Sequence, residues 1–310
     1  MSNLLSRYQG SLLGLAVGDA LGTTVEFKPP GSFEPLTTIV GGGPFSLPAG
    51  AWTDDTSMAL CLATSLVECG GFNADDQMKR YVKWWREGYL SSTGSCFDIG
   101  NTVQSSLRKY QETGNPFSGS TAAMSAGNGS LMRLAPIPLF YFSKPEEAIY
   151  RAAESSRTTH GAVACMDACR YYTALMVGAL QGVEKDDLLN PAWPIVAKLK
   201  QTFCPEIQEV AGGSFRRRQP PGIRGSGYVV QALEAALWAF ASASDFEAGA
   251  LRAVNLGDDA DTTGAIYGQL AGAYFGGDGI PAAWLQVLMQ KDLIKQIATD
   301  LFQHAAAMHV

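Results

Sequence analysis

Residues 257–273 read Gly-Asp-Asp-Ala-Asp-Thr-Thr-Gly-Ala-Ile-Tyr-Gly-Gln-Leu-Ala-Gly-Ala, so carboxylates and hydroxyls pass directly into small apolar residues. Asp and Thr oxygens accept hydrogen bonds from the unpaired N–H groups that open a helix, and this boundary is typical of a helix N-terminus. The apolar part carries Gly and Ala on many faces, as expected of a central helix that its neighbours approach closely. Gly14, Gly18 and Gly22 predict a similarly close approach along the first helix.

Apolar residues recur at helical spacing through most of the chain, whereas the period-two alternation of half-buried strands is nearly absent. One run, residues 36–40 (Leu-Thr-Thr-Ile-Val), could form an isolated strand. Because no strand–helix–strand order repeats, the sequence predicts an all-α protein. The expected helices are Leu4–Leu21, Ser57–Cys69, Ala74–Glu87, Gly100–Tyr110, Pro145–Ser156, Gly161–Leu180, Tyr228–Ser242, Phe246–Leu256, Thr263–Phe275, Pro281–Leu288 and Leu293–Ala307.

Composition favours one compact domain over residues 1–310. Hydrophobic residues make up 46% of the chain against 17% charged, which is ample for a buried core. The proline- and glycine-rich passages at 28–50 and 212–227 are too short to separate two halves. The domain is expected to be closed by its N- and C-terminal portions.

Charge and patterning exclude several classes of partner. The net charge of −6 argues against sequence-independent nucleic-acid binding, which needs a basic face. No signal-peptide pattern opens the chain, and no apolar stretch is long enough to cross a bilayer. The six cysteines lie mostly in helical patterns and are expected to be reduced, mostly buried thiols. We therefore expect a cytoplasmic protein, and a monomer by default.

Two acidic clusters, residues 52–56 (Trp-Thr-Asp-Asp-Thr) and 257–264, together hold five aspartates, more oxygen atoms than two helix caps require. If the fold brings them together, the carboxylates would repel one another unless cations were bound or protons taken up. Hard oxygen donors without nearby Cys or His ligands suit Mg²⁺ or Mn²⁺. We predict a site for one or two such cations, with the ligands Thr53, Asp54, Asp55, Asp259, Asp261 and Thr262.

Other candidates each have a structural alternative. Asp98 precedes a helix and is, on its own, most simply an N-cap. The turn Gly127-Asn128-Gly129 could offer backbone N–H groups to an anion such as a diphosphate. His160 stands at a loop-to-helix junction, where it is either a structural histidine or a ligand contact. Glu26 is either a surface carboxylate or one that a movable loop presents to the metals.

Taken together, these segments resemble the ADP-ribosylglycohydrolase family, in chain order from residue 10 to residue 288. The resemblance is carried by 14–22 (Gly-Leu-Ala-Val-Gly-Asp-Ala-Leu-Gly), 52–56, 97–102 (Phe-Asp-Ile-Gly-Asn-Thr), 127–133 (Gly-Asn-Gly-Ser-Leu-Met-Arg), 159–160 (Thr-His) and 259–264. It implies a compact, single-domain orthogonal helical bundle with two Mg²⁺ or Mn²⁺ ions at the base of a cleft.

The resemblance also implies roles for individual residues. The predicted cation ligands match the family's metal-ligand motifs, although Asp258 adds a carboxylate that leaves open which of Asp258, Asp259 and Asp261 bind metal. Asp98 matches an acid near the substrate ribose and, with Glu26 as the alternative, would handle protons. The substrate-side residues are Asn101, Gly127, Asn128, Gly129 and His160.

The implied function is a dinuclear metal-dependent hydrolase that removes ADP-ribose from modified protein side chains. Arginine-linked ADP-ribose is favoured, because residues 257–264 look closer to the arginine-directed branch of the family. Serine-linked ADP-ribose, O-acetyl-ADP-ribose and a free ADP-ribosylated metabolite stay open as substrates. A non-catalytic ADP-ribose binder or crystallin-like structural relative is the alternative of a different class.

Overall fold

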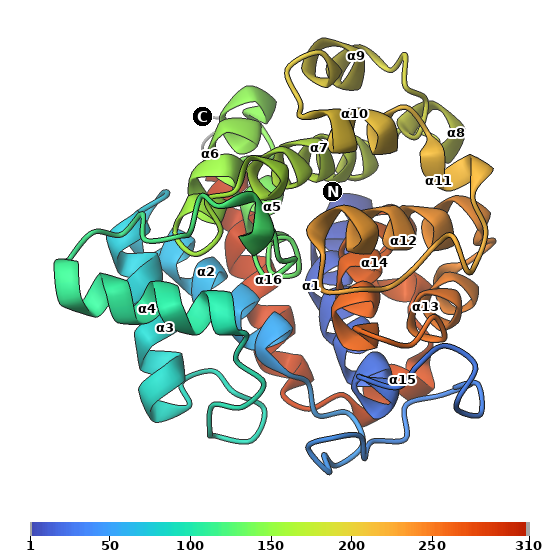
Figure 1. Ribbon diagram of the computed structural model, residues 1–310, viewed down its shortest axis with the longest axis horizontal. Helices are drawn as coiled ribbons and strands as arrows, with labels where there is room; N and C mark the ends of the chain where they lie inside the picture. The colour runs from blue at the N-terminus through green and yellow to red at the C-terminus, as the bar shows by residue number, and fades with distance from the viewer. Residues whose placement is uncertain (1, 308–310) are drawn as a thin grey trace.

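The computed structural model describes residues 2–307, and over that range the protein consists of α-helices, three short 3-10 helices and connecting loops (Figure 1). The β-type pairing in this range is confined to isolated bridges. The prediction of an all-α fold is therefore confirmed. The helices are α1 (Ser2–Gly22), α2 (Asp54–Cys69), α3 (Ala74–Glu87), α4 (Asn101–Thr113), α5 (Pro136–Phe140), α6 (Pro145–Arg157), α7 (Val163–Leu180), α8 (Lys185–Leu188), α9 (Pro194–Lys200), α10 (Pro205–Ala211), α11 (Ser214–Arg217), α12 (Val229–Ser242), α13 (Phe246–Val254), α14 (Ala260–Phe275), α15 (Ala282–Val287) and α16 (Lys291–Ala307), with the 3-10 helices η1 (Thr23–Val25), η2 (Ala123–Ser125) and η3 (Gly277–Gly279).

Every helix expected from apolar spacing is present, with its ends shifted by at most a few residues. Five helices were not expected, α5 and α8 to α11, and each has only four to seven residues. A helix of fewer than two turns is too short to display the 3.6-residue period from which helices are predicted.

The strand considered at residues 36–40 does not form, so that expectation is wrong. The Leu36 N–H donates to Asn255 Oδ1 at 2.7 Å, and Asn255 Nδ2 donates to the Leu36 carbonyl at 3.0 Å. A side-chain amide therefore takes the place of a partner strand at Leu36 and satisfies the backbone of this residue.

At the centre of the fold the first helix pairs with a long helix from the last quarter of the chain, and α1 and α14 run antiparallel (Figure 1). A Cβ at Gly14 or Gly18 would overlap the backbone carbonyl of Gly268 or Gly264, respectively. The predicted close approach along α1 is thus made against α14 itself. This register brings the end of α1 beside the start of α14, so the segment that follows α1 meets the acidic residues that open α14.

Gly268→Ala should destabilise the protein strongly, although alanine is the better helix former. The added Cβ would overlap the Gly14 carbonyl, a backbone group that cannot move aside alone. We expect a loss of about 1–3 kcal/mol or more in the free energy of unfolding, measured by urea titration. Gly71→Ala is the control, since its Cβ would meet only Tyr141 Oη at 3.6 Å. Equal stability of the two variants would show that the helices are not in such close contact.

All six cysteines are free thiols, but only Cys61, Cys165 and Cys169 are buried. Cys69 is exposed, so the expectation of mostly buried thiols is correct for half of them. Among the described helices, none combines the length and apolar character needed to span a bilayer.

Candidate functional site

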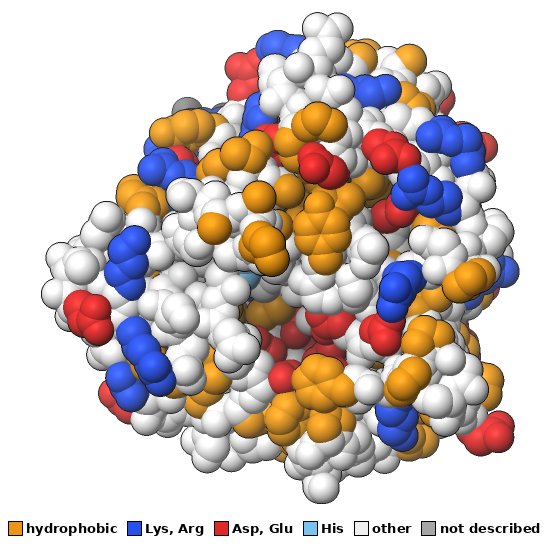
Figure 2. Space-filling view, viewed as in Figure 1, with side chains coloured by type: hydrophobic (Ala, Val, Ile, Leu, Met, Phe, Trp, Pro, Cys, Tyr) orange, Lys and Arg blue, Asp and Glu red, His pale blue; other side chains and the backbone are white. Residues whose placement is uncertain are grey.

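A cavity of about 510 Å³ lies where the segment after α1 meets the start of α14. Figure 2 shows a hollow with acidic side chains at its base. Eleven of the thirteen predicted site residues line it, namely Glu26, Asp54, Asp98, Asn101, Gly127, Asn128, Gly129, His160, Asp259, Asp261 and Thr262. The other two, Thr53 and Asp55, are buried and contact the lining residues Asp261 and Thr262, respectively.

Residues from the two acidic clusters touch at the base of the cavity. Thr53 Oγ1 lies 3.3 Å from Asp261 Oδ2 and 3.2 Å from Asp55 Oδ2. Thr262 Oγ1 lies 3.4 Å from the same Asp55 oxygen. Segments more than two hundred residues apart therefore form one cluster of carboxylates and hydroxyls.

Both clusters open helices, as expected, but the residues at their N-cap positions do not cap these helices with their side chains. Thr53 and Asp259 occupy the N-cap positions of α2 and α14, yet neither side chain accepts a capping hydrogen bond. Gly100, not Asp98, is the N-cap of α4. Asp98 instead has φ of +59°, and its side chain lines the cavity. Asp261 Oδ1 accepts from the Thr262 N–H in the first turn of α14 at 2.8 Å, so the cavity acids are only partly free of local hydrogen bonds.

Asp19, on α1, caps α2 from another helix, and sequence reasoning missed this role. Its carboxylate accepts from the backbone N–H groups of Thr53 at 2.8 Å and Thr56 at 3.1 Å. The Thr53 and Thr56 hydroxyls lie 3.0 and 2.6 Å from it. Asp19 is fully buried, and a lone acid inside an apolar helix was the available signal.

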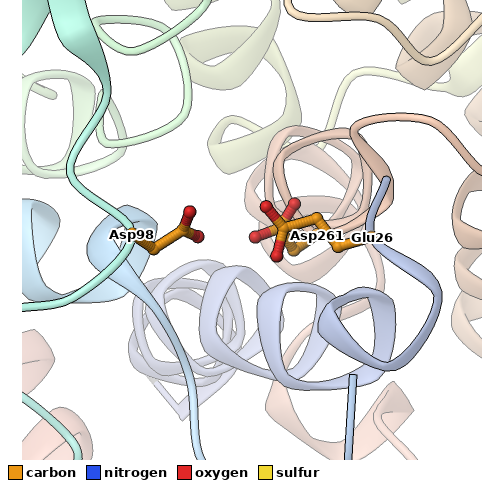
Figure 3. Close-up of side chains that lie close together, drawn as sticks. All are labelled: Glu26, Asp98 and Asp261. Carbon is orange, nitrogen blue, oxygen red and sulfur yellow. The ribbon is translucent and has the colours of Figure 1, made fainter. Parts of the chain in front are cut away.

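Glu26, Asp98 and Asp261 place one carboxylate oxygen each within 4.8 Å of one another (Figure 3). Burial, then the charges of Asp98 and Asp259, raise the pKa of Glu26 to about 9. Burial, then Asp19 and Asp259, raise the pKa of Asp98 to about 7. Burial followed by neighbouring carboxylates also holds the pKa values of Asp54, Asp55 and Asp261 well above their usual range.

The donor set fits hard divalent cations. Glu26 Oε2 and Asp55 Oδ1 are buried without a hydrogen-bond partner. None of the described residues that line the cavity is a lysine or arginine that could offset these charges. Carboxylate and hydroxyl oxygens are the ligands that Mg²⁺ and Mn²⁺ take in proteins.

Without metal, the protein should lose stability as the pH rises. Glu26 and Asp98 have folded-state pKa values of about 9 and about 7, against roughly 4 in an unfolded chain. The folded state then binds more protons than the unfolded state between about pH 4 and pH 9, so the free energy of unfolding falls through that window. Thermal unfolding in EDTA should give a higher melting temperature near pH 5.5 than near pH 8.5. Saturating Mn²⁺ should reduce the difference between these two melting temperatures. A melting temperature that instead rises with pH in EDTA would contradict the raised pKa values of Glu26 and Asp98.

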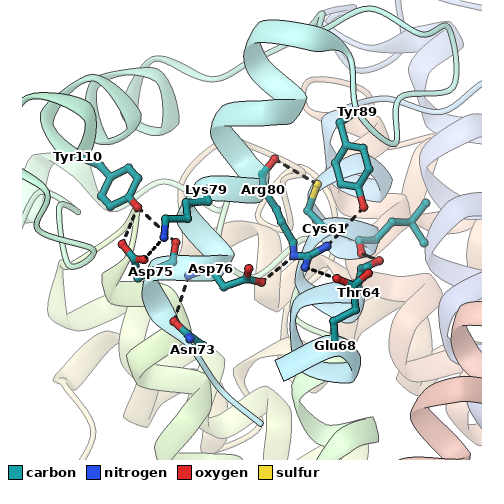
Figure 4. A network of polar contacts seen from close by, with 11 residues as sticks. Cys61, Thr64, Glu68, Asn73, Asp75, Asp76, Lys79, Arg80, Tyr89 and Tyr110 are labelled. Carbon is teal, nitrogen blue, oxygen red and sulfur yellow. Dashed lines mark hydrogen bonds and ion pairs between the residues drawn. The ribbon is translucent and has the colours of Figure 1, made fainter. Parts of the chain in front are cut away.

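The wall that carries Asp98 and α4 is braced by α3. Tyr110 Oη donates to Asp75 Oδ1 at 2.6 Å and so holds α4 against α3 (Figure 4). Arg80 on α3 donates to Glu68 of α2 and Asp76 of its own helix, each at 2.6 Å. The first turn of α4, which includes Asn101, is thereby fixed at the cavity edge.

The glycine turn is less open than expected. The N–H of Gly127 donates to Ser125 and that of Asn128 to Gly227, so two of its three N–H groups are already used. This corrects the expectation that the turn presents several of them to an anion. Asn128 Nδ2 also donates to Asp259 Oδ2 at 2.7 Å, so its side chain positions an acid.

Asp259 and Asp261 line the cavity, but Asp258 does not. Asp258 has φ of +54°, and its backbone pairs with Phe27 and Lys28. Its carboxylate lies 3.6 Å from the Arg224 guanidinium. The geometry therefore separates the extra carboxylate from the acids that face the cavity.

Comparison with known proteins identifies the family. A sequence model of the family described as ADP-ribosylglycohydrolase matches residues 1–309. The chain is 41% identical over 301 residues to a Pseudomonas putida (strain GB-1) protein named ADP-ribosylarginine hydrolase Tri1, covering 97% of this chain and 79% of that protein. It is 31% identical over 292 residues to the Rhodospirillum rubrum ADP-ribosyl-[dinitrogen reductase] glycohydrolase, covering 92% and 91% respectively. A solved structure described as an ADP-ribosylglycohydrolase-related protein complex is 42% identical, with a TM-score of 0.88 and coverage of 98% of this chain and 100% of that chain. This chain belongs to the ADP-ribosylglycohydrolase family.

Proposed function

We propose that this protein is a dinuclear metal-dependent hydrolase that removes ADP-ribose from modified arginine side chains of proteins. The observation that carries the proposal is the convergence of acids from both ends of the chain in one cavity, with buried carboxylate oxygens that lack partners. Membership of the family supports the class of bond.

Two Mg²⁺ or Mn²⁺ ions fit the charge of this cluster. The residues that would hold them are Thr53, Asp54, Asp55, Asp259, Asp261 and Thr262, with Glu26 close by. Bound cations would supply Lewis acidity toward a water molecule and the ribose hydroxyls. Asp19 would keep Thr53 in place through its hydrogen bonds to that residue.

The chain's acids would stabilise the transition state electrostatically. Cleavage of the bond between ribose C1″ and the arginine nitrogen builds positive charge on the sugar, as in glycoside hydrolysis. Carboxylates fixed around the ribose lower the energy of that charge without reorganising.

Asp98 would handle the proton, and Glu26 is the alternative. A proton donor must keep its proton until the leaving group needs it, and burial together with the charges of Asp19 and Asp259 raises the pKa of the Asp98 carboxyl in the metal-free protein. Asp98 would pass its proton to the departing guanidine nitrogen, so that arginine leaves in a stable form. Asn101, Gly127, Gly129 and His160 would bind the ADP-ribosyl group, and Asn128 would act mainly through Asp259.

The arginine linkage is supported by the relatives named ADP-ribosylarginine hydrolase, which include one from Serratia proteamaculans (strain 568) at 37% identity over 305 residues. The test is hydrolysis of matched peptides that carry ADP-ribose on arginine or on serine, with Mn²⁺ or with EDTA. We expect release from the arginine peptide only, and only with metal.

Two other outcomes would redirect the proposal. Release from the serine peptide alone would overturn the linkage while keeping the hydrolase. Tight ADP-ribose binding without release from either peptide or from O-acetyl-ADP-ribose would indicate a non-catalytic binder. Binding should therefore be measured separately, by calorimetry with free ADP-ribose.

A further inference from the structure

Arg133 is a fully buried arginine whose hydrogen-bond acceptors among the described residues are all neutral oxygens, and its Nε has no partner there. Its Nη1 donates to the Gly129 carbonyl at 2.8 Å, and its Nη2 donates to Thr159 Oγ1 at 2.7 Å. The guanidinium also lies 4.7 Å from the centre of the Tyr81 ring. Burying a charge is costly unless it is paired and hydrogen-bonded. A buried guanidinium that is held only by neutral acceptors therefore suggests a function beyond stability.

Thr159 links this guanidinium to the histidine in the cavity wall. The Thr159 side chain is fully buried, and its Oγ1 lies 2.9 Å from His160 Nδ1. A guanidinium can only donate, so toward Arg133 the hydroxyl oxygen must accept. The hydroxyl hydrogen is then available for one other acceptor.

Only one tautomer of His160 satisfies this contact. If Nδ1 carried the hydrogen, it would donate to Thr159 Oγ1. The hydrogen of the buried Thr159 hydroxyl would then have no acceptor, because the described residues offer it no other partner. An unmet buried donor costs about 1–3 kcal/mol. Thr159 therefore donates to Nδ1, and the neutral ring carries its hydrogen on Nε2.

His160 is also held neutral. Burial, then the charge of Arg133, lowers the pKa of His160 to about 3. The ring lines the cavity beside two glycines, where a Cβ at Gly127 would lie 3.3 Å from Nε2 and one at Gly129 only 2.8 Å from Cε1. Nε2 has no protein partner among the described residues and is free to meet a ligand.

We propose that Arg133 and Thr159 are positioning residues that fix His160 as a neutral imidazole with its hydrogen on Nε2. His160 would then donate a hydrogen bond to an acceptor oxygen of a bound ADP-ribosyl group. The identity of that ligand rests on the proposed function, whereas the tautomer does not.

The tautomer is measurable by long-range ¹H–¹⁵N correlation spectra of ¹⁵N-histidine-labelled protein, which contains only three histidines. We expect His160 as the Nε2–H form in the wild type. Thr159→Val, which removes the hydroxyl, should populate both tautomers in similar amounts. Because only the Nε2–H fraction would then be competent, ADP-ribose binding to the metal-loaded protein should weaken about twofold. Thr159→Ser, which keeps the hydroxyl, should restore both properties.

Thr158→Val is the matched control. Thr158 Oγ1 also accepts from Arg133, at 3.3 Å, but has no contact with His160. Its substitution should leave the tautomer unchanged, and circular dichroism would confirm that each variant folds. An Nδ1–H form in the wild type, or an unaltered tautomer in Thr159→Val, would overturn the proposal. The spectra need no substrate, so a failed hydrolysis assay would not be confused with this failure.

Discussion

Asp55→Asn is expected to abolish metal-dependent ADP-ribose release and, at the same time, to raise the melting temperature of the metal-free protein. Asp55 is fully buried, and its Oδ1 has no hydrogen-bond partner. Its neighbours Asp19 and Asp259 add to the cost of burying its charge. Without metal, replacing that carboxylate by a neutral amide should stabilise the fold by about 1–4 kcal/mol.

With Mn²⁺ the sign should reverse. The two proposed cations, each at a hundred times its Kd, would stabilise the folded state by about 2.7 kcal/mol apiece, and together they outweigh the gain of the metal-free variant. Loss of a ligand removes most of this stabilisation. Calorimetric melting with EDTA and with Mn²⁺, for wild type and variant, would reveal the crossing of the two stabilities.

Asp258→Asn is the matched control for Asp55→Asn. It removes a carboxylate from the same acidic stretch, but one that faces Arg224 instead of the cavity. Asparagine also tolerates the left-handed backbone at this position. We expect it to keep both the Mn²⁺-induced stabilisation and the hydrolysis. Destabilisation of Asp55→Asn in EDTA as well as in Mn²⁺ would identify Asp55 as a structural residue.

The long helices were predictable because a periodic apolar pattern is a local property of the sequence. The glycine spacing of α1 and α14 was equally visible, and it correctly indicated close approach. The spacing did not predict that α1 packs against α14. Small residues at this spacing allow a helix to approach any of several others, and these two helices lie about 250 residues apart in the sequence. Convergence of the two acidic clusters was the condition from which the need for cations followed, and the α1–α14 register is what brings the clusters together.

The roles of residues whose partners are distant in the sequence could not be predicted from local sequence patterns. Caps are assigned to sequence neighbours, so Asp19, which caps α2 from α1, could not be recognised as a cap. Arg133 likewise acts on His160 through Thr159, a contact set by tertiary packing. The free N–H groups of the glycine turn were overestimated because Gly227, which takes one of them, lies about a hundred residues away.

Asp98→Asn should lower turnover by about 10²- to 10⁴-fold, the range that a positioned general acid or base contributes. The amide cannot hold or release the proton that the Asp98 carboxyl would exchange. The positive φ of +59° is one that asparagine adopts readily, so the loop should keep its shape.

Mn²⁺ titration by calorimetry should find binding close to that of the wild type, because the predicted ligands are untouched. Single-turnover hydrolysis of the arginine-linked peptide measures the rate. A near-normal rate would remove Asp98 from the proton transfer and favour Glu26, whereas loss of Mn²⁺ binding would make Asp98 a metal ligand, which its closeness to Asp261 permits.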